Sequence, residues 1–149
     1  MNFGTEDVDF FTSAQEAVVA EGNPYFCFRF AGLPGADVLR LGGVVIESGD
    51  AELNKKFAKH RDADVVAHAK IVIESGDIMM NYKFAKDVSG CDVAAHGKVI
   101  IDSEDVNLNK KFVKLPGADI AEHQKKFRYS DDVVQAREKS EIKLIIDEK

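Results

Sequence analysis

Residues 70–86 read KIVIESGDIMMNYKFAK, and closely similar stretches occur at two other places in the chain. Residues 43–59 read GVVIESGDAELNKKFAK, and residues 98–114 read KVIIDSEDVNLNKKFVK. Each copy has a short apolar run, a Ser-Gly-Asp or Ser-Glu-Asp turn, and a second run with Phe two residues before Lys. An internal repeat of this kind fixes the architecture that all other residues must fit.

Two columns of polar residues give the period of the repeat, which is 27 or 28 residues. One column holds Asp37, Asp64, Asp92 and Asp119, and the other holds Asn23, Asp50, Asp77, Asp105 and Asp132. We therefore interpret residues 1–149 as a single repeat domain with units at about 10–36, 37–63, 64–91, 92–118 and 119–149. The outer two units are degenerate, as capping repeats are in solenoid proteins.

The spacing of apolar residues favours helices over strands. Val93, Gly97, Ile100 and Ile101 lie at i, i+4, i+7 and i+8, which places them on one helix face. The turn at residues 75–77 offers glycine to end one helix and aspartate to cap the next. We predict an all-α fold, a short right-handed α-solenoid of about five helix-turn-helix repeats. A β-solenoid is the alternative, because the short apolar runs are rich in β-branched residues.

In the best-preserved unit the first helix is predicted from Asp64 to about Ser75 and the second from Asp77 to about Lys86. The second helix carries two apolar columns that we assign to the core, and together they hold Phe26, Leu53, Met80, Leu108, Phe30, Phe57, Phe84 and Phe112. Residues 2–9 are interpreted as frayed or as a short arm outside the repeat, and residues 140–149 as a final short helix or a strand.

Composition describes a soluble chain. Of 149 residues, 45% are hydrophobic and 31% are charged, and the formal net charge is −6. No apolar run approaches the roughly 20 residues of a membrane helix, and the first residues lack a basic leader. The negative charge disfavours a general nucleic-acid binder. Cys27 and Cys91 stand at unrelated repeat positions, which favours reduced thiols in a cytoplasmic protein.

The pattern VIESGD, followed by an Asn-x-Lys-Phe-Ala-Lys helix and a Gly-Ala-Asp return, resembles a known kind of repeat. It is similar to the tandem 27–28-residue helix-pair repeats of bacteriophages and large DNA viruses, best over residues 16–119. Departures are Glu104 and Asp131 at the glycine position, and the absence of Phe-Ala in the last unit. The resemblance implies a small α-solenoid without a catalytic signature.

Three histidines, His68, His96 and His123, share one column, in which the second unit has Leu41. Neighbouring helices lie about 8–10 Å apart, whereas a zinc ion holds ligands at about 2 Å, so one ion cannot be shared by three repeats. We interpret these histidines as semi-exposed rings near the hairpin seam, with a row of partner contacts as the alternative. We expect no metal and no cofactor.

Basic residues also form columns on the second helix, and these are the candidate binding residues together with the histidines. The columns hold Arg29, Lys56, Lys83 and Lys111, and then Lys59, Lys86 and Lys114. A third column, on the first helix, holds Lys70, Lys98 and Lys125. Carboxylates gather at the turn between the helices, at Glu47, Glu74, Asp102 and the capping aspartates. The pattern indicates either ordinary solvated faces or a surface with a basic stripe and an acidic edge.

Catalysis is not expected, because the serines before the turn (Ser48, Ser75, Ser103 and Ser130) recur as turn residues, and a catalytic serine needs only one site. The leading hypothesis is a non-enzymatic protein–protein interaction module. Nucleic-acid binding along the lysines and acidic mimicry of nucleic acid are the alternatives, and a homodimer through a terminal unit stays open. The resemblance alone implies a phage-encoded accessory factor, or an inhibitor of a host defence complex, in the host cytoplasm.

Overall fold

The computed structural model describes residues 5–128, and within this range the chain is helical with no strand. The helices are α1 (Thr5–Glu21), α2 (Pro24–Ala31), α3 (Val38–Ser48), α4 (Ala51–Phe57), α5 (Val65–Ser75), α6 (Ile78–Asp87), α7 (Val93–Ser103) and α8 (Val106–Phe112). A further helix occupies residues 120–128. The all-α prediction is confirmed and the β-solenoid alternative is wrong. The right-handed sense stays a prediction.

Short polar residues begin the helices as the sequence predicts. The side chains of Asp37, Asp64 and Asp92 accept a hydrogen bond from the third residue of α3, α5 and α7, at 3.1–3.2 Å. The carboxylates of Asp50, Asp77 and Asp105 do the same for α4, α6 and α8, at 2.8–2.9 Å. Each cap satisfies an amide that has no partner inside its helix, so the capping columns set the boundaries of the repeat.

Helices α3 and α5 end on a glycine in the left-handed conformation, as predicted. Gly49 and Gly76 both have φ of 69°. In α7 the same position is Glu104, which keeps this backbone with φ of 63°. The departure from glycine therefore leaves the turn geometry unchanged, although an L side chain is strained there.

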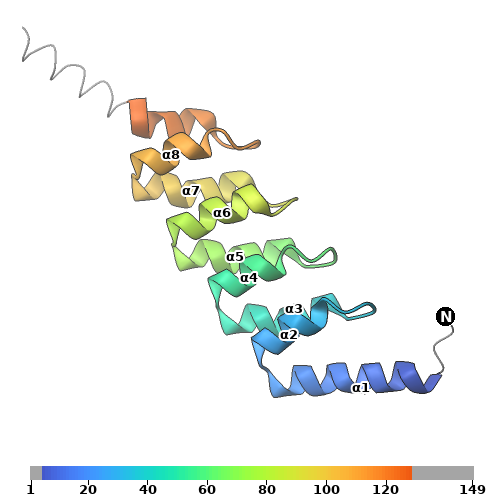
Figure 1. The fold of residues 1–149 in the computed structure, drawn as a ribbon. Coiled ribbons are helices and arrows are strands. Elements are labelled where there is room, and N and C mark those ends of the chain that lie inside the picture. The colour runs from blue at the N-terminus through green and yellow to red at the C-terminus, as the bar shows by residue number, and fades with distance from the viewer. Residues whose placement is uncertain (1–4, 129–149) are drawn as a thin grey trace, which may run out of the picture.

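The hairpins stack as a staircase in which the odd-numbered and even-numbered helices form two rows (Figure 1). Each of α1 to α8 contacts only helices one or two places away along the chain, as in a solenoid. The closest association joins the second helix of one repeat to the first helix of the next, as in α2 with α3. No helix of the described residues is long and apolar enough to cross a membrane.

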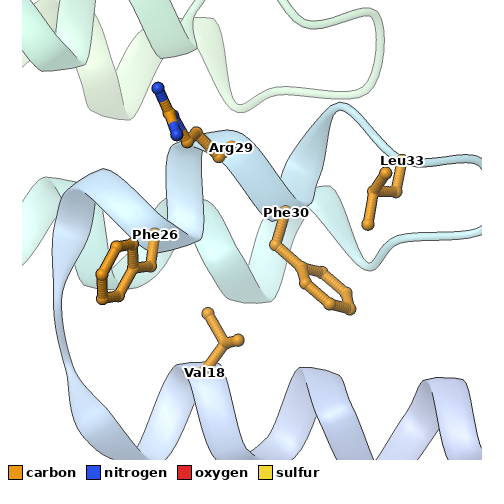
Figure 2. A pocket seen from close by; sticks show the side chains of 5 residues that line it. All are labelled: Val18, Phe26, Arg29, Phe30 and Leu33. Carbon is orange, nitrogen blue, oxygen red and sulfur yellow. The ribbon is translucent and has the colours of Figure 1, made fainter.

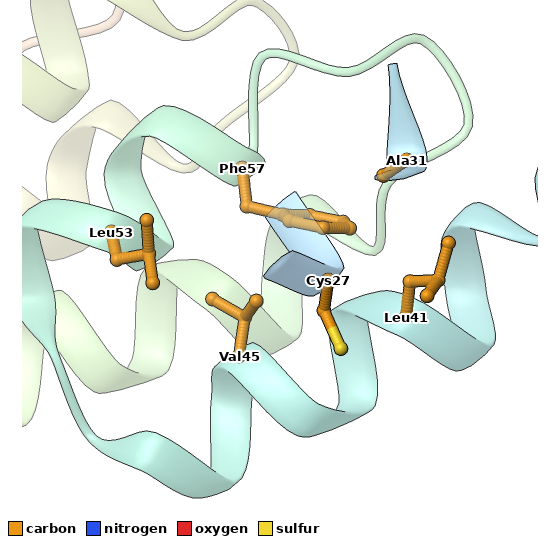
Figure 3. Packing of buried hydrophobic residues seen from close by; sticks show 6 residues of the cluster. All are labelled: Cys27, Ala31, Leu41, Val45, Leu53 and Phe57. Atoms are coloured by element: carbon orange, nitrogen blue, oxygen red, sulfur yellow. The ribbon is translucent and has the colours of Figure 1, made fainter. Parts of the chain in front are cut away.

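The core lies between successive repeats and centres on one phenylalanine of each of the second helices α4, α6 and α8. Phe57, Phe84 and Phe112 are fully buried, each in its own apolar cluster. In the first cluster the ring of Phe57 lies among Cys27, Leu41 and Val45 (Figure 3). Because a helix of seven to ten residues is marginal alone in water, these junctions hold the stack together.

The first repeat departs from the prediction in two ways. Helix α1 begins at Thr5, so residues 5–9 are helical and do not form an arm. Phe26, assigned to the core by its column, is 48% exposed, whereas its counterpart Leu53 is 3% exposed. The core assignment of Phe26 is therefore wrong. The reason is that no described helix precedes this repeat to cover it. The second helix of the fifth unit and the tail at 140–149 lie outside the described residues.

Candidate protein-binding surface

A buried asparagine in each of the second helices α4, α6 and α8 ties together the two helices of its own repeat. The Nδ2 atom of Asn54 donates one hydrogen bond to the carbonyl oxygen of Val45, at 3.0 Å, and one to that of Asp50, at 2.8 Å. Asn81 and Asn109 make the same pair of bonds in the next two repeats. Both amide hydrogens are thereby used, which leaves the Oδ1 atom as an acceptor.

The histidine of the following repeat completes this network. His68 Nδ1 lies 2.7 Å from Asn54 Oδ1, and the corresponding distances for His96 and His123 are 2.8 and 2.7 Å. Because Oδ1 can only accept, Nδ1 carries the proton and Nε2 does not. Each Nε2 atom is buried without a hydrogen-bond partner. The three pairs therefore link the second, third and fourth repeats each to the repeat that follows it.

The same imidazole rings stack on the core phenylalanines. The ring centroids of His68 and Phe57 are 4.9 Å apart, and those of His96 and Phe84 are 4.6 Å apart. The close packing of these two rings against the first helix of the preceding repeat requires a small residue in that helix. At Gly42, an added Cβ atom would lie 2.9 Å from the ring of Phe57 and 3.1 Å from His68 Nε2. Glycine inside α3 thus serves the packing of the next repeat.

The prediction that the histidines are semi-exposed is wrong. His68 is 1% exposed, and His96 and His123 are 0% exposed. Burial lowers the pKa of His68 and of His96 to about 4 and lowers that of His123, partly offset by the capping aspartate of each helix. Neutral, enclosed rings cannot reach a partner on the surface, so these three residues are removed from the candidate binding set.

The turn serines and capping aspartates also make hydrogen bonds within the fold. In each turn the serine hydroxyl donates to a carbonyl of its own helix at 2.6 Å, in Ser48, Ser75 and Ser103. It also accepts from the amide of the capping aspartate two residues later, at 3.3 Å. These serines are turn residues, as predicted; Ser130 lies outside the described part. Within residues 5–128, no group of three or more His, Cys, Asp or Glu side chains is arranged to hold a metal ion.

The basic residues on the second helices are the candidate binding residues that lie on the surface. We define the lysine surface as Arg29, Lys56, Lys59, Lys83, Lys86, Lys111 and Lys114, all of which are exposed. Their side chains project from α2, α4, α6 and α8 or from the residues just after them, so they follow one row of the staircase (Figure 1). Charges on equivalent positions of stacked helices reinforce one another as a continuous positive potential.

Most of the lysine surface takes no part in holding the fold. Lys56 pairs with Glu52 within α4 at 3.2 Å, and this hydrogen bond raises the pKa of Lys56. Lys83, Lys86 and Lys111 make no ion pair with any described residue. The neighbouring Lys55 is different, because it is largely buried and pairs with Asp87 of the next repeat at 3.1 Å. That pair lowers the pKa of Asp87 and belongs to the scaffold.

The predicted acidic edge and the third lysine column lie on the first helices. Glu47, Glu74 and Asp102 are exposed near the ends of α3, α5 and α7. Lys70 pairs with Glu74 at 3.8 Å, and Lys125 pairs with Glu122 at 2.6 Å. Opposite charges on this row therefore partly neutralise one another, whereas on the lysine surface only Lys56 has an ion-pair partner among the described residues.

The first repeat carries an apolar depression of about 370 Å³ between α1 and α2. It is lined by Val18, Phe26, Arg29, Phe30 and Leu33. Figure 2 shows Phe26 and Phe30 directed from α2 toward Val18 of α1, whereas the guanidinium of Arg29 points the other way. Sequence reasoning missed this site, because the column positions predicted that both phenylalanines would be covered.

The fold and these surfaces describe a helical-repeat protein built from one repeating hairpin. Comparison of the chain with protein-family models, curated proteins and solved structures gives no match.

Proposed function

We propose that this chain is a non-enzymatic protein-binding module whose lysine surface docks on an acidic surface of a partner protein. One observation carries the proposal: the lysines recur in successive repeats although the scaffold does not need them. The other recurring polar residues, namely the aspartate caps, turn serines, asparagines and histidines, are used within the fold. Lys83 and Lys111 have no such use.

The shape of the molecule supports a protein partner. Stacked helix pairs present a long, regular row of side chains, and helical-repeat proteins use such rows as extended binding surfaces. Electrostatic complementarity along the row would guide association and select the partner. The resemblance to phage and viral repeats extends the proposal to a phage-encoded accessory factor, or to an inhibitor that acts on a host defence complex.

The lysine surface also favours a second candidate, binding to nucleic acid. The net charge of −6 weighs against it. Acidic mimicry of nucleic acid has less support, because Asp50, Asp77 and Asp105 already accept hydrogen bonds from their own helices.

Charge reversal tests the proposal. The double variant Lys83→Glu, Lys111→Glu changes exposed residues without an ion pair, so it should fold normally. The matched control is Lys70→Glu, Lys98→Glu on the first helices. Quantitative affinity capture from the source cells should identify a partner, and the purified partner should lose about tenfold or more in affinity for the Lys83→Glu, Lys111→Glu variant only.

The outcomes separate the two candidates. Equal binding of the partner by both variants would refute the lysine surface as the contact. If the wild-type chain instead binds single-stranded RNA or DNA, with an affinity that falls steeply with salt, nucleic acid becomes the ligand.

A further inference from the structure

The three inner junctions between repeats each enclose a histidine nitrogen that has no acceptor for a second proton. These junctions join α4 to α5, α6 to α7, and α8 to the helix at residues 120–128, and their histidines are His68, His96 and His123. Each ring already uses its Nδ1 proton on an asparagine. Each Nε2 atom is buried without a partner.

The first helix of the preceding repeat lies beside this nitrogen. A Cβ atom added to Gly42 would be 3.1 Å from His68 Nε2, and one added to Gly97 would be 2.8 Å from His123 Nε2. A proton added to Nε2 would therefore point into a packed helix and stay without a hydrogen-bond acceptor. Burial of a charged group without such a partner is strongly unfavourable.

The charged groups near these rings are few among the described residues. The capping aspartate of each histidine's own helix favours the charged form of the ring, and His60, in the loop after α4, disfavours that of His68. From the preceding repeat each ring meets an uncharged asparagine and a phenylalanine, and neither pairs with Nε2. Burial outweighs the aspartates, so it lowers the pKa of His68 and of His96 to about 4 and also lowers that of His123. The aspartates concerned are Asp64, Asp92 and Asp119.

Acid therefore favours an open junction over a closed one. In an open junction the ring meets water and takes up a proton as the pH falls below the ordinary pKa of 6.5. In the closed junction the ring of His68 or His96 stays neutral until the pH approaches its pKa of about 4. Between pH 7 and pH 5 the ratio of open to closed forms should thus rise about twentyfold for each such histidine that is released.

The junction between α2 and α3 lacks this response. Cys27 and Leu41 stand where the inner junctions have asparagine and histidine, and both are fully buried. Burial and the nearby Glu21 raise the pKa of the Cys27 thiol, so it stays neutral in acid. The first two repeats should therefore stay joined at a pH that opens the repeats after them.

The lysine surface crosses the inner junctions. Lys56, Lys83 and Lys111 stand on α4, α6 and α8, one on each of three successive repeats. Helix α4 contacts α6, and α6 contacts α8, so the row is continuous while the junctions are closed. Opening of the first inner junction would separate Lys56 from Lys83, and opening of the second would separate Lys83 from Lys111.

We propose that the inner junctions form an acid-sensitive switch, in which protons taken up at Nε2 of the buried histidines open the stack after the second repeat and divide the lysine surface. The protons come from solvent, and no covalent bond between heavy atoms is made or broken. The opening depends only on the junctions, whereas its effect on partner binding rests on the proposed function. Histidine suits such a switch because its two protonation states prefer different packing.

Hydrogen–deuterium exchange of the full chain, read by mass spectrometry at pH 7 and pH 5, tests the switch. After correction for the slower intrinsic exchange in acid, amides of α5, α6 and α7 should lose protection about twentyfold or more. Amides of α2 and α3 should change by less than about threefold, because the junction between these helices has no histidine.

Two variants remove one of the titrating groups. Asn81→Cys combined with His96→Leu copies the junction between α2 and α3, and it should reduce the acid-induced loss of protection in α6 and α7. His96→Gln takes up no proton, and its amide can still donate to Asn81 Oδ1. The matched control is Ile100→Val on α7, at a fully buried position. It removes a methylene and no titratable group, so it should lower protection by the same factor at both pH values.

Three results would overturn the switch. One is unchanged protection of α6 and α7 between pH 7 and pH 5. Another is an equal loss of protection from α2 to α8, because the chain would then unfold as a whole. The third is the same acid-induced loss in the wild type and in both His96 variants.

Partner binding is a separate measurement, so the two proposals can fail independently. A purified partner should bind the wild-type chain at pH 7 and bind it about tenfold or more weakly at pH 5. Equal binding at both pH values, with exchange showing the opening, would support the switch and refute the lysine surface as the contact.

Discussion

The first junction between repeats and the three that follow it have the same arrangement of helices but differ in the polarity of two buried residues. At the inner junctions a buried asparagine and a buried histidine meet, as in Asn54 with His68. At the first junction the corresponding residues are Cys27 and Leu41, both fully buried. The Cys27 thiol lies 3.9 Å from the carbonyl oxygen of Val18, which corresponds to the acceptor of Asn54. Polar and apolar forms of the junction therefore share one backbone arrangement.

From the joint replacement we infer that asparagine and histidine act as a unit. An asparagine facing leucine would leave Oδ1 buried without a donor, and a histidine facing cysteine would leave the Nδ1 proton without a good acceptor. A buried polar group that loses its partner costs about 1–3 kcal/mol, whereas exchange of both partners for apolar groups is nearly neutral. The pair is one solution to the junction and not a requirement of the fold.

The largest expected effect is on the free energy of unfolding, which should fall more when a fully buried phenylalanine is removed than when the partly covered one of the first repeat is removed. Phe84→Ala should lower the free energy of unfolding by about 3–5 kcal/mol, because it empties a fully buried junction. Phe30→Ala, at the equivalent position of the first repeat, should cost about 1–2 kcal/mol, because the ring of Phe30 is only partly covered and water can fill the space. Urea unfolding followed by circular dichroism measures both values. A loss below about 1 kcal/mol for Phe84→Ala would contradict the core assignment.

A double-mutant cycle tests the asparagine–histidine unit directly. Asn81→Cys and His96→Leu should each destabilise the chain by about 2–3 kcal/mol, because each leaves a buried partner unsatisfied. The double variant copies the first junction and should be more stable than the sum of the single losses predicts, by about 1 kcal/mol or more. Urea unfolding of the four chains gives the coupling energy. Simple additivity of the two losses would show that the pair is not a unit.

Acid should weaken the inner junctions and leave the first junction unaffected. The pKa of His68 and of His96 is about 4 in the folded chain, below the ordinary value of 6.5. Below pH 6.5 the histidines of the unfolded chain bind protons more readily than the buried histidines of the folded chain. Their contribution to the free energy of unfolding is therefore fully present above that pH and is lost as the pH falls toward 4. Between about pH 7 and pH 5 the loss should be about 2 kcal/mol for each histidine.

The measurement is the free energy of unfolding as a function of pH. Asp64 and Asp92, which cap the helices of these histidines, offset part of the effect of burial on the histidine pKa. The variant with both Asn81→Cys and His96→Leu serves as the control and should lose less stability between these pH values. Identical pH profiles for the wild type and this variant would show that His96 does not contribute.

Local chemistry explains which features could be predicted from the sequence. A cap such as Asp77 and a turn glycine such as Gly76 act within a few residues, so the period, the helix boundaries and the turns follow from the pattern. The lysine surface was also predictable as a set of aligned positions. The described structure confirms the helical repeat, whereas binding by these lysines stays a prediction.

Features that depend on two repeats could not be derived in the same way. The bond between Asn81 and His96 joins residues 15 positions apart on helices of different repeats. Its signal in the sequence is that Cys27 and Leu41 depart from their columns together. Exposure of Phe26 was missed for a related reason, since a column position gives the direction of a side chain but not what covers it.

The smallest expected effect concerns a position at which the first repeat is regular and the fourth is not. Gly22 and Glu104 occupy the same turn position, with φ of 72° and 63°. Left-handed backbone costs an L-residue about 1–2 kcal/mol, so Glu104→Gly relieves strain there. The substitution also removes an exposed ion pair with Lys126 and adds freedom to the unfolded chain. The net result should be a gain of about 0.5 kcal/mol, measured by urea unfolding. The reciprocal change, Gly76→Glu in the third repeat, should cost about 1 kcal/mol, and a neutral result there would show that the turn does not discriminate against side chains.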